Sequence, residues 1–179
     1  MKYVSKYMKN FAEILNGFGE DQFEATIKQI NQTKLSGGKL IFVGNGGSAA
    51  MASHLSVDFT KACNIRSICF NEADLLTCLS NDFGYENWVV EALRFYADAQ
   101  DLVFLISSSG TSANITNAAD YCNEAGLKLI TLSGFSSDNP LAVCGAINLH
   151  IPSQRYNYVE MAHHTWLVAL VDRLSIDAD

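Results

Sequence analysis

The sequence predicts an α/β protein, a three-layer α/β/α sandwich with a five-stranded parallel sheet, preceded by an N-terminal pair of helices. Short apolar runs alternate along the chain with segments of helical periodicity. Such alternation is typical of a parallel sheet covered by helices on both faces. Two of the apolar runs are also followed by loops rich in glycine and serine that open helical segments, as strand-to-helix connections do.

Apolar residues recur at helical spacing before the first apolar run. They recur from residue 4 to residue 18 and again from residue 23 to residue 30. The pattern breaks around residues 17–20. Two amphipathic helices are therefore expected. A sheet sandwich does not need this pair, so residues 1–35 are predicted to form an extension that packs on its own domain or on another subunit.

The remaining pattern predicts five buried strands and the helices between them. The strands are expected at residues 39–43, 66–70, 102–106, 128–132 and 147–151. The helices are expected near residues 48–62, 73–80, 86–97, 112–125 and 156–175.

Composition indicates one domain, residues 1–179, with a net charge of −7. No run of lysine or arginine is present to bind a nucleic acid backbone, so nucleic acid is not an expected partner. The five cysteines include no C-x-x-C pair, which argues against a disulfide framework or a zinc ribbon. No apolar stretch resembles a signal peptide or a membrane span, and a cytoplasmic location without a membrane partner is expected.

The two loops, Gly44–Ser48 and Ser107–Ser112, predict a site for a phosphorylated ligand. A loop that leaves a buried strand and enters a helix presents free N–H groups and the positive end of the helix dipole. Glycine allows close approach of an anion, and the hydroxyls add hydrogen-bond donors. Neither loop ends in Gly-Lys-Ser/Thr, which argues against a triphosphate-binding P-loop.

A dinucleotide site is the alternative prediction for the first loop. Residues 44–49 fit the G-x-G-x-x-A pattern, and Glu72 follows the second predicted strand, where a ribose-binding acid would lie. The second loop counts against this alternative, because a dinucleotide normally needs one such loop.

Three ordered segments resemble the sugar isomerase (SIS) domain family: residues 42–48 (FVGNGGS), 79–84 (LSNDFG) and 106–114 (ISSSGTSAN). Within that family the chain is most similar to the phosphoheptose isomerases, and the similarity extends from the N-terminal helices to the last helix. Also similar is the DnaA-initiator-associating protein, which binds a partner and has no isomerase chemistry.

The resemblance implies a set of substrate-binding residues in the two loops, in the segment between them and on the last helix. They are Asn45, Gly46, Gly47, Ser48, Asn81, Asp82, Ser107, Ser108, Ser109, Ser112 and Glu160.

A metal site is also implied, because the family places a histidine and a glutamate on the helix after the first loop. Those positions are His54 and Asp58 here. The family's glutamine and histidine on the last helix correspond to Glu160 and Val168, and valine cannot bind a metal. His164 lies on the same helix face as Glu160. We therefore predict a zinc ion held by His54, Asp58, Glu160 and His164.

Aldose–ketose interconversion needs a base to move a proton between neighbouring carbons and a group that stabilises the enediolate oxygen. The predicted catalytic residues are Asp58 as the base and His164 as metal ligand or as the acid that moves the oxygen proton. His150 is expected to be structural. Asp58 is one methylene shorter than the family's glutamate, which is a departure at the reacting centre.

Two functions follow from this pattern. One is the isomerisation of sedoheptulose 7-phosphate to D-glycero-D-manno-heptose 7-phosphate, in heptose biosynthesis for lipopolysaccharide or capsule. The alternative is a non-catalytic SIS-domain protein that binds a phosphosugar or regulates a partner. For either function the resemblance implies a homo-oligomer, expected to be a tetramer.

Overall fold

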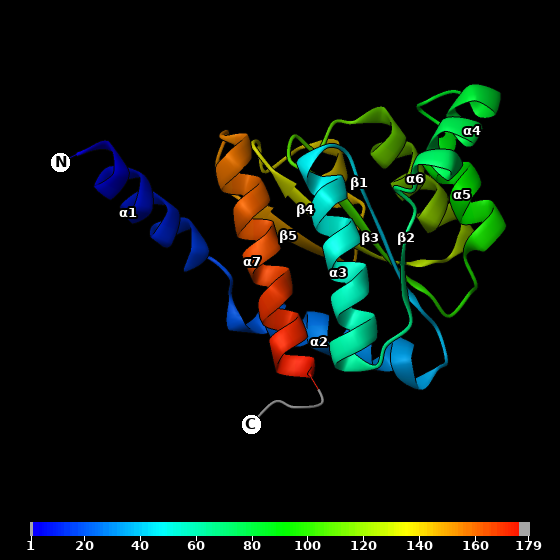
Figure 1. Cartoon of the computed structure of the whole chain (residues 1–179), viewed down its shortest axis with the longest axis horizontal. Helices are drawn as coiled ribbons and strands as arrows, with labels where there is room; N and C mark the ends of the chain where they lie inside the picture. Colours follow the sequence, from blue (N-terminus) through cyan, green and yellow to red (C-terminus); the bar gives the residue numbers. More distant parts are fainter. Residues whose placement is uncertain (1, 176–179) are drawn as a thin grey trace.

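Residues 2–175, which the computed structural model describes, form an α/β fold around a sheet of five parallel strands (Figure 1). The strand order is β2-β1-β3-β4-β5. The predicted fold class is confirmed. The strands are β1 (Leu40–Gly44), β2 (Ser67–Cys69), β3 (Leu102–Ser107), β4 (Lys128–Gly134) and β5 (Ile147–Ile151).

The helices begin and end within a few residues of their predicted bounds. They are α1 (Tyr3–Leu15), α2 (Glu20–Leu35), α3 (Gly47–Cys63), α4 (Ala73–Phe83), α5 (Trp88–Tyr96), α6 (Ala113–Ala125) and α7 (Tyr156–Leu174). A 3-10 helix at Pro140–Val143 was not predicted; the Asn139 side chain caps it by accepting a hydrogen bond from the Ala142 N–H at 3.0 Å. Within residues 2–175, no helix is long and apolar enough to cross a membrane.

Alternate residues of the strands build two cores, one on each face of the sheet. In β1, Leu40 and Phe42 belong to the core beneath α2, α3 and α7, while Ile41 and Val43 belong to the core beneath α4, α5 and α6. This alternation follows from the two-residue period of a strand. Figure 1 shows α3 and α7 side by side and running in the same direction.

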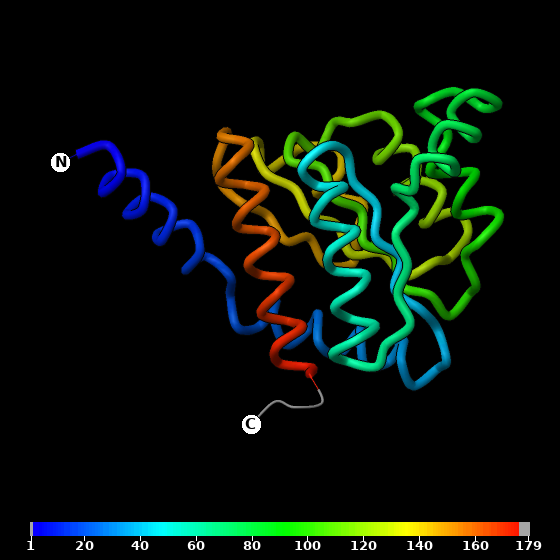
Figure 2. Tube along the Cα trace, in the orientation of Figure 1, coloured from blue at the N-terminus to red at the C-terminus, as the bar shows by residue number. Residues whose placement is uncertain are grey.

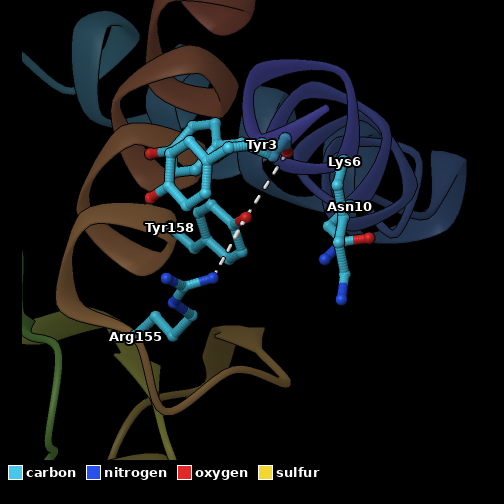
Figure 3. Close-up of a pocket in the computed structure, with 6 residues that line it drawn as sticks. Tyr3, Lys6, Asn10, Arg155 and Tyr158 are labelled. Atoms are coloured by element: carbon cyan, nitrogen blue, oxygen red, sulfur yellow. Dashed lines mark hydrogen bonds between the residues drawn. The ribbon is translucent and has the colours of Figure 1, made fainter. Parts of the chain in front are cut away.

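The first helix, α1, extends from the body of the molecule in the traces of Figures 1 and 2. It has no buried residue, although Phe11 and Ile14 pack against the core. Its contact is with α7. Tyr158 donates to the Tyr7 carbonyl at 3.4 Å and accepts from Arg155 at 3.3 Å. Figure 3 shows the hydrogen bond between Arg155 and Tyr158. The opposite face of α1 is left in solvent.

The order of the sheet places a topological switch beside β1. Its two neighbours, β2 and β3, lie on opposite sides of it. The chain leaves β1 into α3 on one face of the sheet, and β3 leads to α6 on the other. In open α/β sheets, ligands bind in the crevice that such a switch opens at the carboxyl ends of the strands.

Candidate active site

A cavity of about 300 Å³ lies at this switch point, between the loops that follow β1 and β3. The first turns of α3 and α7 complete its wall. The two loops predicted to bind a phosphorylated ligand therefore meet at one site. The lining residues are Asn45, Gly46, Gly47, Ser48, Ile106, Ser107, Ser108, Ser109, Ser112, Tyr156 and Glu160.

The first loop brings the N-terminus of α3 to the cavity. A Cβ at Gly44 would lie 2.7 Å from the Ser48 backbone, so only glycine lets the helix begin this close to the strand. Gly46, the N-cap of α3, has a φ of +55°, which also favours glycine. The positive end of the α3 dipole therefore lies at the cavity wall, where it favours an anion.

The second loop contributes hydroxyl groups to the opposite wall. Ser107 Oγ lies 3.2 Å from Ser112 Oγ, and the Gly110 N–H donates to the Ser107 carbonyl at 3.0 Å. The Ser108 hydroxyl is buried and has no hydrogen-bond partner in the described part of the chain. An unpaired buried hydroxyl is costly, and a phosphate oxygen in the cavity would satisfy it.

Two asparagines join the loops to one another. The side-chain amides of Asn45 and Asn114 exchange two hydrogen bonds, each of 2.9 Å. Tyr85 donates a third, of 3.1 Å, to Asn45 Oδ1. Neither Tyr85 nor Asn114 was predicted as a site residue, although both lie in or beside the segments that carry the family resemblance. Their role is to hold Asn45 in place.

Asn81 and Asp82, predicted to bind substrate, are not among the residues that line the cavity. They lie on α4, where Asn81 Nδ2 donates to Asp82 Oδ1 at 2.9 Å and both side chains are exposed. The nearby residue that reaches the loops is Tyr85, just beyond the end of α4.

His54, Asp58 and His164 form a hydrogen-bonded chain between α3 and α7. His54 Nε2 lies 3.0 Å from Asp58 Oδ2, and His54 Nδ1 lies 2.8 Å from His164 Nε2. A carboxylate only accepts, so in neutral His54 the Nε2 donates to Asp58 and the Nδ1 accepts from His164. The prediction that His164 faces His54 agrees with this contact. Burial lowers the pKa of His164, as does the neighbouring His54, while Asp58 opposes them.

The four predicted zinc ligands do not converge on one point in this arrangement. Asp58 and His164 contact opposite nitrogens of the His54 ring, so the three side chains are not directed at a common ion. Across residues 2–175, no group of three or more histidine, cysteine or acidic side chains is placed to hold a metal. Zinc stays a prediction from the family resemblance, and no chemical step below depends on it.

Glu160 and Val168, on α7, have different surroundings. Glu160 lines the cavity, and burial raises the pKa of its carboxyl group above the usual value. Val168 is partly buried and packs against the core beneath α3 and α7. The position where the family has a histidine is therefore part of the apolar packing.

The dinucleotide alternative receives no support from the position of Glu72. This residue lines a separate cavity beside β2 and α4, together with Phe70 and Cys78. The loop cavity does not include it. A dinucleotide bound at the first loop would lack its predicted ribose contact.

His150 and His163 also lie outside the loop cavity. His150 Nδ1 is 3.3 Å from Ser133 Oγ, and burial lowers the pKa of its ring. The structural role predicted for His150 fits these contacts.

These features define an α/β protein with a cavity between two Gly/Ser loops at the switch point of a parallel sheet. The model of the SIS domain family matches residues 6–134, so the chain belongs to the SIS domain family.

Relatives and solved structures are consistent with that membership. The phosphoheptose isomerase of Syntrophotalea carbinolica is 28% identical, with 96% of this chain and 91% of the relative covered. The phosphoheptose isomerase of Glaesserella parasuis is 30% identical, with 80% of each chain covered. The structure of phosphoheptose isomerase from Neisseria gonorrhoeae has the same fold, with a TM-score of 0.88, 23% identity and 96% of each chain covered.

Proposed function

We propose that this protein is an aldose–ketose isomerase that converts sedoheptulose 7-phosphate to D-glycero-D-manno-heptose 7-phosphate. The observation that carries the proposal is the single cavity between two Gly/Ser loops, with an unpaired serine hydroxyl on one wall and a carboxylate on another. The relatives named phosphoheptose isomerase, which match 80–96% of the chain, support it. The non-catalytic alternative is less favoured, because these relatives carry the name of an enzyme.

The geometry divides the work of the reaction between the walls of the cavity. The helix N-terminus and the serine hydroxyls bind the phosphate and fix the sugar's orientation. A base then removes a proton from C1 of the ketose, and a proton returns to C2, while O2 gains a proton and O1 loses one. The sequence-based prediction gives the carbon proton to Asp58 and makes His164 a metal ligand or the acid that moves the oxygen proton, although neither residue lines the cavity.

The double variant Ser109→Ala/Ser112→Ala should weaken the binding of sedoheptulose 7-phosphate by more than tenfold. Both hydroxyls line the cavity, and each is an available donor to a phosphate oxygen. Isothermal titration calorimetry measures the change. The matched control Thr116→Ala removes a hydroxyl that bonds back to the α6 backbone at 3.2 Å, outside the cavity, and should bind normally. Equal affinity of the double variant and the wild type would refute the assignment of residues 107–112 as the loop that binds the phosphate.

We also propose that the protein self-associates as a tetramer through α1, in the cytoplasm. Tyr3 and Met8 of α1 are 72% and 59% exposed, and an apolar face of this kind is stabilised by covering it. The five cysteines are all free, as expected in a reducing compartment.

Light scattering of the wild type at micromolar concentration should give the mass of four chains, and Val4→Asp/Met8→Asp should reduce that mass. The two introduced carboxylates would be buried without partners in any interface that covers α1. Val143→Asp is the control, at a valine outside α1 that is 78% exposed against 64% for Val4, and it should leave the mass unchanged. A monomeric wild type would contradict the proposal.

A further inference from the structure

We propose that Glu160 is the general base that carries the proton between C1 and C2 of the sugar. This inference rests on the proposed isomerase function and assigns its central step to a residue of the last helix. It differs from the sequence-based assignment, which gave the step to Asp58.

The composition of the cavity wall is the first argument. Glu160 is the only carboxylate among the described residues that line it. The other lining groups are backbone amides, hydroxyls, one side-chain amide and an apolar side chain. None of these is basic enough at neutral pH to take a proton from carbon, whereas a carboxylate is a common general base.

The contact between Glu160 and Gly47 is the second argument. A Cβ at position 47 would lie 2.4 Å from Glu160 Oε2 and 2.9 Å from Oε1, so the carboxylate occupies the space that any other side chain would fill. Both oxygens therefore lie against the first turn of α3, where the substrate's phosphate site begins. No side chain within residues 2–175 donates a hydrogen bond to them or forms an ion pair with them.

The anchoring of Glu160 is the third argument. Its neighbours Val159 and Ala162 on α7 are fully buried in the core. A base that projects from a rigid helix keeps its distance to the substrate, and errors of about 1 Å at a reacting centre cost roughly 100-fold in rate.

Asp58 is placed differently. It follows Gly47 by about three turns of α3, roughly 16 Å along the helix axis. Its carboxylate is engaged by His54 Nε2 at 3.0 Å, and it does not line the cavity. In this chain Asp58 orients His54, and through it His164, and has no direct route to a sugar in the cavity.

The step balances with one residue acting twice. The Glu160 carboxylate takes the proton from C1, and the electron pair of the C–H bond forms the C1–C2 double bond of the enediol. The resulting carboxylic acid then returns the proton to C2 on the same face. As the C1–C2 double bond forms, the π electron pair of the C2 carbonyl moves to O2, which takes a proton from water. O1 gives a proton to water when the C1 carbonyl forms, so the two transfers cancel and no oxidant or reductant is needed.

The test compares Glu160→Gln with the wild type, using sedoheptulose 7-phosphate as the probe. Glutamine has the same shape and is the residue that the family carries at this position, so folding should be preserved. The kcat should fall about 10²- to 10⁴-fold, the usual contribution of a general base. The affinity measured by calorimetry should stay within about threefold, because the phosphate contacts are intact. Deuterium incorporation from solvent at C2 of the product should fall with kcat.

Two further variants make the result specific. Glu160→Asp keeps a carboxylate and should recover part of the lost rate, which a purely structural role would not predict. Glu124→Gln, the same change at an exposed position on α6, should leave kcat unchanged.

The outcomes separate this inference from the proposed function. A wild type that isomerises the sugar together with a Glu160→Gln variant of similar kcat would overturn the role of Glu160 only. If Asp58→Asn then abolished exchange, the base would be Asp58 of the same or a neighbouring copy. A wild type that neither binds nor isomerises the sugar would overturn both proposals.

Discussion

Replacing His163 by alanine should lower the free energy of unfolding by about 3 kcal/mol. The side chain is completely buried, and its Nε2 lies 3.1 Å from the Ser133 carbonyl and 3.0 Å from the Leu149 carbonyl. Carbonyls only accept, so Nε2 carries the proton and links α7 to both β4 and β5. Removing the ring would leave a cavity and take a donor away from two buried carbonyls.

Urea unfolding at pH 7 measures this loss. His164→Ala is the matched control, because His164 is adjacent on α7 but only partly buried, and it should cost less than about 1 kcal/mol. Equal costs for the two variants would contradict the structural role of His163.

The same residue predicts a pH dependence. Burial lowers the pKa of His163 to about 4 from the usual 6.5, and its two backbone hydrogen bonds partly offset this effect. In the unfolded chain the ring takes up a proton as the pH falls below 6.5, whereas in the folded chain it stays neutral until about pH 4. The contribution of His163 to stability is therefore complete above pH 6.5 and is lost on acidification, by up to about 3 kcal/mol.

Urea unfolding between pH 7 and pH 4 in wild type and His163→Gln isolates this contribution, since the other titrating groups are shared. Stability of the variant should decline less steeply with falling pH. Parallel curves for the two proteins would refute the buried neutral state of the ring.

Gly110→Ala should destabilise the second loop by about 3 kcal/mol and weaken phosphosugar binding more than tenfold. A Cβ at this position would lie 1.8 Å from Asn139 Oδ1, and the φ of Gly110 is +68°. Asn139 cannot move aside, because it is buried and its amide donates to the Ser136 carbonyl at 2.7 Å and accepts from the Ala142 N–H at 3.0 Å. Accommodating the methyl group requires the loop to leave the cavity wall.

Gly126→Ala controls for the backbone conformation. Gly126 has a similar φ of +70°, but nothing lies within 4 Å of the position of its Cβ. This variant should lose only about 1 kcal/mol, the cost of the left-handed conformation, and bind the sugar normally. Thermal unfolding and calorimetry report both quantities. If the two alanine variants behaved alike, the clash with Asn139 would have no role.

Local periodicity was sufficient to predict the secondary structure and the class of fold. The run at Leu102–Ile106 is buried along its whole length, and its continuous apolar character indicated this. Strand ends were less exact: β2 is limited to Ser67–Cys69, because pairing with β1 ends where the chain turns away. The loop residues that line the cavity were also identified, since glycine and serine in a strand-to-helix turn are recognisable from a few neighbouring residues.

The partners of the charged and polar side chains were decided by tertiary structure. Neither the pairing of β1 with β3 nor the packing of α3 against α7 follows from the residues within one element. That pairing brings the two loops to one cavity, and that packing sets His164 against His54. The packing of α3 against α7 also leaves Asp58 outside the cavity and places Glu160 against Gly47.

The sequence by itself determined the α/β class, the order of the elements and the two Gly/Ser loops, because each depends on a period or a turn only a few residues long. Only the tertiary structure decided which carboxylate shares the cavity with those loops. Glu160 lies more than a hundred residues from the first loop in the chain, and no local pattern encodes contacts over such separations. They arise when the helices pack on the sheet and bury their apolar faces together.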